Sequence, residues 1–330
     1  MNWNDFLQEH RPERNTAEAD CALTALTSLG LIRVQGEDAR DFLQGQLTND
    51  IQAVTAEQAQ LSAWCTPKGR MLALMLVFQH GDDLCLQLPR ERITPVLKRL
   101  GMYVMRAKVT LSDASEALPI MALGGDCTGG LAESMPAGDF SCRQYGELTM
   151  IRFPGEQPRA QVIGTADALA AAWKKAAATA TQVNQAWWRL QNIRSGIPAI
   201  YDATAETFVP QMLNLDLLGG VSFTKGCYTG QEVVARMKYL GQIKRRMYLA
   251  RFDAAETPAP GDKLFSPHSK SAQGAGKLVD VQSSPGGGWE ALIAAEISSV
   301  EAGGMRLGDA AGPALEVQPP PYGLKDADSG

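Results

Sequence analysis

Runs of hydrophobic residues divide the first hundred residues of the chain into short strands and a few helices. Apolar runs predict four strands, at residues 31–34, 60–66, 71–78 and 84–88. Apolar residues at helical spacing predict one helix that begins after Asp38 and another near residues 91–101. A further strand is predicted at residues 103–111. Strands, helices and hairpins mixed in this way indicate an α+β fold and not regular βαβ winding.

The middle of the chain continues this mixed pattern. Strands are predicted near residues 118–123 and 147–153, on either side of a glycine-rich segment. An alanine-rich helix is predicted at about residues 165–178. A second helix begins near Gln182, and Gly196 ends it.

The pattern changes after Gly241, where strands become short and are separated by turns rich in proline and glycine. Five strands are predicted there, at residues 247–252, 263–265, 277–281, 290–295 and 314–317. Short strands at this spacing indicate a small β-barrel or β-sandwich. We therefore predict a body at residues 1–241, with sub-domains at about 1–112 and 113–241, and a C-terminal β domain with an extended tail at 242–330.

Composition excludes several classes of protein. The chain has 330 residues and a net charge of −5, which argues against sequence-blind nucleic-acid binding. No apolar run is long enough to cross a membrane, and the N-terminus has no secretory signal. The six cysteines have no zinc spacing and the three histidines are scattered, so we predict no stable metal site. We also expect a cytoplasmic location and a monomer.

One segment of eight residues, from Lys225 to Glu232, has the strongest chemical signal. It places Cys227 between two glycines, just ahead of a predicted helix that Gly241 ends. Thr229 and Glu232 have the spacing of a capping box at the start of that helix. A helix N-terminus and a neighbouring lysine both favour thiolate over thiol. We therefore interpret Cys227 as a functional thiol.

The helix after Gln182 contains two adjacent tryptophans. A helical wheel places Trp187 on the apolar core face and Trp188 nearly opposite, among polar side chains that include Asn192. One interpretation is that a neighbouring domain covers Trp188. The other is that Trp188 forms a flat wall for a planar ligand, whose edge the nearby amides read.

Basic residues are concentrated between Val233 and Phe252, where six occur and no acidic residue does. They are explained either by the preference of a helix C-terminus for positive charge or by an anion site near the cysteine loop. The second interpretation involves Lys244, Arg245 and Arg246.

The KGCYTGQE sequence of residues 225–232, taken with residues 208–211 and 214–223, closely resembles the YgfZ family. This is a family of bacterial folate-binding proteins linked to tRNA modification. Residues 42–50 and 66–70 extend the resemblance to the first half, so that it covers most of the chain.

The resemblance implies an aminomethyltransferase-like, folate-binding α+β body with mixed and antiparallel sheets and helices, followed by a small C-terminal β-barrel. This fold is similar to that of the T-protein of the glycine-cleavage system. The resemblance also implies that tetrahydrofolate is the ligand, with Trp188 at the position of a tryptophan implicated in folate binding. We expect further ligand contacts from Asn192, Arg194, Gln211, Lys225, Tyr228 and Gln231, with the anionic tail near Lys244, Arg245 and Arg246.

Two positions depart from the family pattern. Leu29 stands where the family has a tryptophan, which removes one aromatic wall. Arg194 stands where T-proteins have a glutamate that accepts hydrogen bonds from the pterin. Because arginine has only donors, either Gln211 or Asn192 is the acceptor or the ligand sits differently.

The resemblance leaves three functions open. The first is a folate-binding accessory protein, not an enzyme, that supports iron–sulfur enzymes of tRNA modification through Cys227. The second is a folate-dependent one-carbon transferase, for which Asp50 is the candidate catalytic aspartate. The third is a thiol protein for redox or cluster handling that binds no small molecule. A common fold does not decide among these three. A fourth function, direct tRNA binding, is disfavoured by the acidic net charge.

Overall fold

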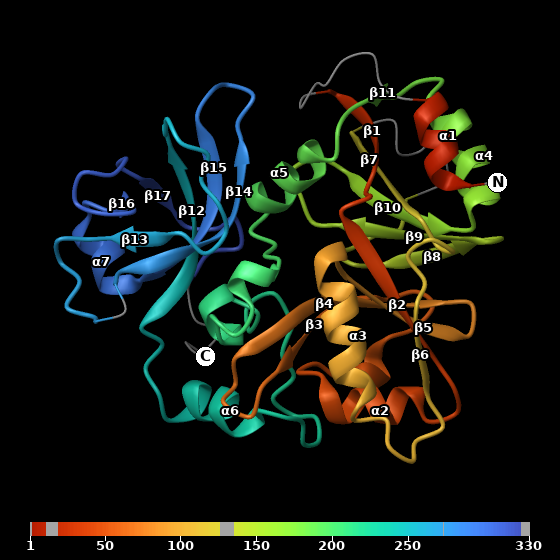
Figure 1. Cartoon of the computed structure of the whole chain (residues 1–330), viewed down its shortest axis with the longest axis horizontal. Helices are drawn as coiled ribbons and strands as arrows, with labels where there is room; N and C mark the ends of the chain where they lie inside the picture. The colour runs from red at the N-terminus through yellow and green to blue at the C-terminus, as the bar shows by residue number, and fades with distance from the viewer. Residues whose placement is uncertain (1, 11–18, 126–134, 273, 325–330) are drawn as a thin grey trace. The chain divides into compact units, whose positions relative to one another are not determined.

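A computed structural model of the chain describes residues 2–10, 19–125, 135–272 and 274–324 (Figure 1). The chain forms two compact units, each assembled from separate stretches of sequence. The first unit consists of Met1–Gln44, Asp50–Gln60 and Met75–Arg189, and the second of Gly45–Asn49, Leu61–Leu74 and Leu190–Gly330. The predicted boundaries at residues 112 and 241 stay predictions.

The described α-helices are short. They are α1 (Trp3–Glu9), α2 (Ala39–Gln46), α3 (Ile93–Gly101), α4 (Ala166–Ala176), α5 (Ala186–Arg194), α6 (Gln231–Tyr239) and α7 (Ile297–Ala302). Single turns of 3-10 helix include η1 (Ile51–Ala53), η2 (Arg90–Arg92), η4 (Asp202–Thr204) and η5 (Pro210–Leu213). None of the helices in the described ranges is long and apolar enough to cross a lipid bilayer.

The strands form three sheets. The first sheet has the order β11 (Thr181–Gln182), β1 (Cys21–Ala25), β7 (Ile120–Gly125), β10 (Arg159–Gly164), β9 (Leu148–Phe153) and β8 (Cys142–Tyr145). The second has the order β3 (Gln60–Cys65), β4 (Met71–His80), β5 (Asp83–Pro89), β2 (Leu29–Gln35) and β6 (Thr110–Asp113). The third has the order β16 (Arg306–Leu307), β13 (Lys263–Phe265), β14 (Gly276–Ser283), β15 (Trp289–Glu296), β12 (Arg245–Phe252) and β17 (Glu316–Gln318).

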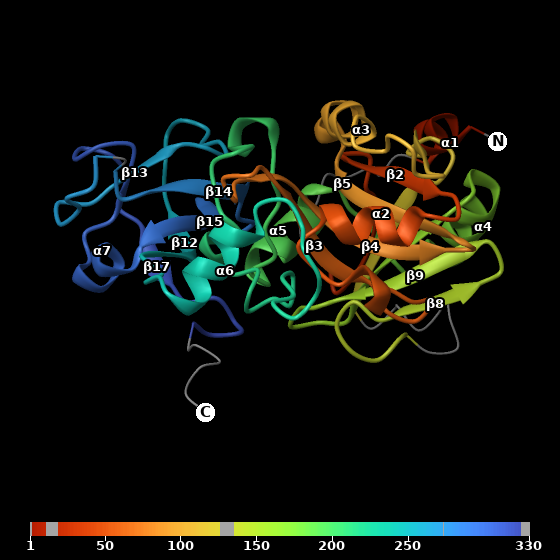
Figure 2. The ribbon, with the colours of Figure 1, turned by 90° about the horizontal axis from the view of Figure 1, so that it is seen from below.

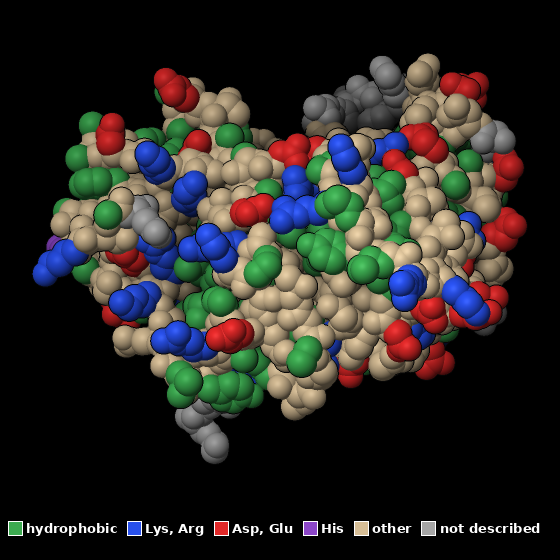
Figure 3. Space-filling view, turned by 60° about the horizontal axis from the view of Figure 1, so that its bottom comes forward, with side chains coloured by type: hydrophobic (Ala, Val, Ile, Leu, Met, Phe, Trp, Pro, Cys, Tyr) green, Lys and Arg blue, Asp and Glu red, His purple; other side chains and the backbone are tan. Residues whose placement is uncertain are grey.

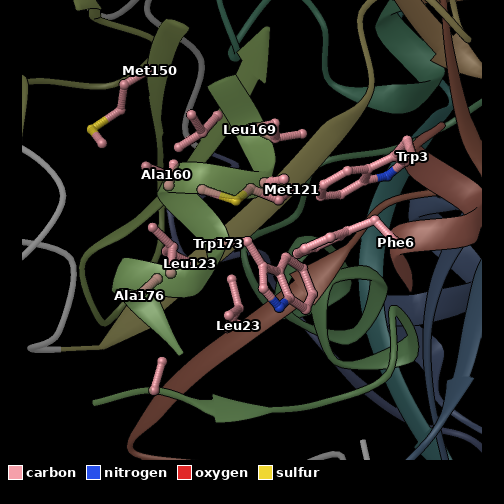
Figure 4. Close-up of a cluster of buried hydrophobic side chains, with 14 residues drawn as sticks. Trp3, Phe6, Leu23, Met121, Leu123, Met150, Ala160, Leu169, Trp173 and Ala176 are labelled. Carbon is pink, nitrogen blue, oxygen red and sulfur yellow. The ribbon is translucent and has the colours of Figure 1, made fainter. Parts of the chain in front are cut away.

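Helices α1 and α4 pack side by side over the first sheet (Figures 1 and 2). Helix α4 begins where the Thr165 hydroxyl accepts a hydrogen bond from the Ala168 N–H, and lysines occupy its last turn, where they suit the helix dipole. The indole of Trp173 packs edge-on against Trp3 and Phe6 at centroid distances of 5.8 and 6.3 Å (Figure 4). Trp3 and Phe6 are the buried residues of α1, so these ring contacts hold the helix in place.

A buried amide pair joins β5 and β10 inside the first unit. The Gln87 side-chain amide donates to the Gln161 Oε1 at 2.7 Å, and both residues are buried. Because a buried amide without a partner destabilises the fold by about 1–3 kcal/mol, this pair fixes how the two strands face each other.

An ion pair between a half-buried arginine and a buried glutamate fixes the third sheet in the second unit. Arg194, the last residue of α5, donates to both carboxylate oxygens of Glu290 on β15, at 3.0 and 2.7 Å. The Ser284 hydroxyl adds a hydrogen bond of 2.9 Å. Burial alone would raise the pKa of Glu290, but the hydrogen bonds from Arg194 and Ser284, together with the charges of Arg194 and Arg251, outweigh burial and lower it.

Most of the predicted elements are present, and the predicted α+β class is confirmed. The five strands predicted after Gly241 correspond to β12–β15 and β17 of the third sheet. The strand predicted at residues 103–111 is wrong over most of its length, because residues 102–108 form turns. Met105 has a φ of +47°, which breaks an extended strand, and β6 begins only at Thr110.

The predicted start of the second helix is also wrong. Thr181 and Gln182 pair with β1 as a parallel strand, and α5 begins at Ala186. The side-chain oxygen of Asn184 accepts a hydrogen bond from the Ala186 N–H at 2.8 Å, so this asparagine sets the start. The sequence also did not predict β1, β8, β10, β16, α1 or α7.

We predict that Gly124→Ala destabilises the first unit. A Cβ at this position would lie 2.3 Å from the Trp187 ring, so the indole would have to move within a packed core. The expected loss is about 2 kcal/mol in the free energy of unfolding, measured by urea denaturation. The control is Gly101→Ala, where an added Cβ meets nothing within 4 Å. Equal stability of the two variants would contradict the predicted clash.

We predict that Glu290→Gln reduces stability at neutral pH by about 2 kcal/mol, because it removes charge-assisted hydrogen bonds. The pKa of Glu290 is lowered by folding, so the ion pair contributes above the unfolded pKa of about 4.3 and loses its contribution as pH falls through the folded pKa. The difference from the wild type, followed by thermal denaturation, should therefore shrink below about pH 4. Glu316→Gln, at an exposed position on β17, should show no such dependence.

Candidate functional site

Cys227 is the accessible free thiol of the described chain. It is exposed, whereas the other free cysteines described, Cys65, Cys85 and Cys142, are buried. Burial raises the pKa of each of those three thiols to about 12. They stay protonated near neutral pH, so thiol chemistry in the described residues falls to Cys227.

The loop of Cys227 is anchored by Lys225. Its ammonium donates to the carbonyl oxygens of Leu47 and Asn49, at 2.7 and 3.0 Å. The same nitrogen lies 5.2 Å from the centroid of the Tyr228 ring. Lys225 therefore holds the loop against residues 47–49, and these contacts identify a supporting role for it.

Residues 47–49 also hold the segment that precedes the loop. The Thr48 hydroxyl donates to the Gly220 carbonyl at 2.8 Å, and the Asn49 side-chain amide donates to the Gly219 carbonyl at 2.6 Å. The Ser222 N–H donates in turn to the Thr48 carbonyl at 3.0 Å. Two segments that carry the family resemblance are thus joined by direct hydrogen bonds.

The turn at residues 66–70 supports the start of α6 from another direction. Gly230 has a φ of +86°, and a Cβ there would lie 2.5 Å from the Thr66 carbonyl oxygen. Gly69 has a φ of +69°, and a Cβ there would lie 3.0 Å from the Val233 side chain. Both positions require glycine because the two backbones approach so closely.

The predicted capping box is wrong. Helix α6 begins at Gln231, its N-cap residue is Gly230, and no side chain caps it. The left-handed conformation of Gly230 moves the start of the helix beyond Thr229, so the Thr229 hydroxyl and Glu232 carboxylate are not placed to exchange hydrogen bonds with the first turn. The predicted end is close, since Leu240 is the C-cap residue.

Tyr228 is a buried anchor of the loop. Burial raises its pKa, and the nearby Cys65 thiol raises it further, so the phenol stays neutral. Its carbonyl accepts a hydrogen bond from the Gln231 N–H at 3.2 Å. The side chain of Gln231 is half-buried at the first position of α6.

Gln211 has an unsatisfied acceptor. Its side chain is fully buried and its amide donates to the Val234 carbonyl of α6 at 2.6 Å. Its Oε1 atom has no hydrogen-bond partner within the described residues. Arg194 is instead fully engaged with Glu290, and Asn192 is half-buried on α5.

Trp188 belongs to the first unit and is buried, with 2% of its surface exposed. The Arg159 guanidinium lies over its ring at 4.7 Å, and Phe153 packs edge-on at 4.9 Å. Burial lowers the pKa of Arg159 to about 9, so it remains charged at neutral pH. The indole N–H of Trp188 has no partner in the part of the chain that the structure describes.

The basic residues beyond α6 are mostly engaged. Arg246 is buried and donates to Asp216 at 2.6 Å, and Arg245 pairs with Glu296 at 3.3 Å. Lys244 is exposed and has no ion pair in the described ranges. These contacts favour a structural role for both arginines.

Asp50 caps a turn of 3-10 helix in the first unit. Its carboxylate accepts hydrogen bonds from the Gln52 N–H at 3.1 Å and from the Gln44 side-chain amide at 2.9 Å. These contacts are typical of a cap.

Three residues with a part in these arrangements were not predicted from the sequence. Arg159 and Phe153 pack on Trp188, and Glu290 binds Arg194. A charged residue at the head of an apolar strand, as at Arg159 and Glu290, is the signal that could have indicated buried ion pairs or ring contacts.

Comparisons with known proteins agree with this arrangement. Residues 3–162 match the family model of the GCVT N-terminal domain. The chain has a TM-score of 0.70 with the glycine cleavage system aminomethyltransferase T from Bartonella henselae, at 12% identity, covering 95% of this chain and 88% of that one. The predicted aminomethyltransferase-like fold is therefore confirmed.

Curated relatives match nearly the whole chain. It is 31% identical over 309 residues to the tRNA-modifying protein YgfZ of Yersinia pseudotuberculosis, covering 92% of this chain and 93% of that protein. It is 30% identical over 321 residues to the protein of the same name from Yersinia enterocolitica, covering 96% and 97%. By this extent of identity, the chain belongs to the YgfZ family.

Proposed function

We propose that this protein binds a reduced folate and supports tRNA modification as an accessory protein, through the thiol of Cys227. The observation that carries the proposal is an exposed thiol on a loop that two other segments, residues 47–49 and 66–70, hold in place. The name of the relatives supports a role in tRNA modification, and the family model and fold support a folate ligand.

The ligand argument begins with Trp188. Its buried indole N–H lacks a partner within the described residues, and such a donor costs about 1–3 kcal/mol. A folate heterocycle offers carbonyl and ring-nitrogen acceptors, and its flat surface suits aromatic contact. A ligand that accepted this hydrogen bond would recover the energy, which makes Trp188 the residue on which we expect affinity to depend.

The acceptor that reads the donor edge of the pterin is proposed to be Gln211. Arg194 stands where T-proteins have a glutamate. Its charge is paired with the Glu290 carboxylate on β15, so it is already engaged by the protein. Gln211 keeps a buried, unsatisfied Oε1 atom, which suits a pterin N–H group. Between the two alternatives that the sequence offers, the contacts of Gln211 favour it over Asn192.

The thiol supplies chemistry that folate lacks. A thiolate is the protein ligand of iron–sulfur clusters and the nucleophile of thiol exchange. Because such a cluster takes about four thiolates, we propose that Cys227 contacts a client iron–sulfur enzyme transiently. A one-carbon transferase gains no support from Asp50, whose carboxylate caps a turn.

We expect Trp188→Ala to weaken tetrahydrofolate binding about tenfold, because it removes both the aromatic surface and the indole donor. Isothermal titration calorimetry measures the affinity directly. Trp188→Phe should recover part of the loss, since it restores the ring but not the N–H. Trp289→Phe, on β15, is the matched control and should bind as the wild type does. Unchanged affinity of Trp188→Ala would remove the proposed wall.

We expect Cys227→Ser to abolish support of tRNA methylthiolation in cells that depend on this protein, while folate affinity stays unchanged. Mass spectrometry of digested tRNA measures the modified nucleoside. The control is Cys142→Ser at a buried thiol, with protein level checked by immunoblot. Normal methylthiolation in the Cys227→Ser cells would exclude a role for the thiol, and would leave the folate proposal standing.

A further inference from the structure

The C-terminal end of α6 exposes large apolar side chains. Tyr239 is 63% exposed and Leu240 is 86% exposed. Large apolar side chains at such exposure are a small minority among the described residues, and they gather at two places, here and at Met102–Met105. An exposed apolar group beside a proposed functional loop suggests a contact surface.

Aromatic rings and a cation are interleaved at this end of the helix. The rings of Phe223 and Tyr239 meet edge to face at a centroid distance of 6.1 Å. The Lys238 ammonium lies 4.3 Å from the Phe223 centroid and 5.9 Å from that of Tyr239. The lysine therefore lies against both rings while keeping its charge available at the surface.

The charge of this region is positive and is not neutralised nearby. Arg236 and Lys238 lie in the last turn of α6 and have no ion pair within the described residues. The helix dipole accounts for basic residues at this end, but it does not account for exposed aromatic and aliphatic side chains beside them. The combination points to a ligand with both flat apolar groups and negative charge.

We propose that the α6 surface, formed by Phe223, Arg236, Lys238, Tyr239 and Leu240, binds a single-stranded segment of RNA. A base would stack on the Tyr239 ring, and the adjoining phosphates would bind Arg236 and Lys238. In a nucleotide, base and phosphate are joined through one sugar, so a ring and a cation a few ångströms apart can bind both. An acidic peptide would use the cations but would leave the rings without flat partners.

The proposal rests on the proposed role in tRNA modification and adds direct contact with RNA to it. The net charge of −5 argues against a protein that coats RNA regardless of sequence. On the face drawn in Figure 3, Lys and Arg side chains are interspersed with acidic and hydrophobic ones. The α6 surface is small and carries exposed rings, so it suits a short, unpaired RNA segment better than a duplex.

The test is fluorescence anisotropy of the full chain with a labelled single-stranded RNA of about eight nucleotides. Tyr239→Ser should weaken binding about tenfold, and Tyr239→Phe should bind as the wild type does, since it keeps the ring. Arg236→Gln with Lys238→Gln should lower the slope of log affinity against log salt by about 1.4, which corresponds to two phosphate contacts. Tyr103→Ser, at an exposed tyrosine of the first unit, is the control and should change nothing.

Three results would overturn the proposal: no binding by the wild type at about 50 mM salt, equal affinity of Tyr239→Ser and wild type, or displacement of RNA by poly-glutamate at equal charge concentration. The last result would identify a surface for acidic peptides. Tetrahydrofolate titration of the same variants should match the wild type, because none of these residues is proposed to touch folate. Loss of RNA binding and loss of folate binding are thereby distinguished.

Discussion

The position of the Cys227 loop depends on one close approach, between the Thr66 carbonyl and the backbone of Gly230. A side chain at Gly230 would collide with that carbonyl, so the chain can turn into α6 only with glycine there. Gly69 packs against Val233 at the same place. At the other end of the loop, the Lys225 ammonium donates hydrogen bonds to the backbone of residues 47–49. The result is an exposed thiol on a fixed backbone. A fixed backbone loses little conformational entropy when the thiol engages a partner.

Some buried polar groups in this protein have hydrogen-bond partners, and others do not. Arg194 and Glu290 satisfy each other through two hydrogen bonds, and Ser284 adds a third. The Trp188 N–H and the Gln211 Oε1, by contrast, have no partner within the described chain. Satisfied groups fix a fold, whereas unsatisfied ones are places where a ligand gains most from a hydrogen bond. This contrast is why Arg194 is not proposed as a folate contact.

The elements that the sequence predicted well are those with strong periodicity. Helix α4 and strand β4 have long apolar patterns, and the third sheet has regular turn signals. The failures have local causes. Residues 102–108 have a strand-like composition, but nothing in their pattern reveals the left-handed Met105, and a capping-box spacing does not show that Gly230 takes the N-cap. Such conformations are set by contacts between distant segments.

The sequence indicated which residues of the candidate site to consider, but not which side chains from other segments surround them. The sequence predicted that Cys227 lies in a loop just ahead of a helix, and the structure exposes its thiol there. The helical wheel placed Trp188 away from the core face, but the structure buries it beneath Arg159 and Phe153. A wheel describes one helix alone, so it cannot show which side chains from other strands cover the opposite face. The same limit concealed the carboxylate partners of Arg245 and Arg246.

The discontinuous make-up of the second unit bears on how the chain folds during its synthesis. Residues 45–49 and 61–74 leave the ribosome long before the residues around 190–240 that they contact. At ordinary translation speeds the interval is on the order of ten seconds. During that time the early segments can bind each other, as where the Thr48 N–H donates to the Ala63 carbonyl, but they lack the partners that residues 219–225 supply. The loop that contains Cys227 can therefore reach its native contacts only after most of the polypeptide has been made.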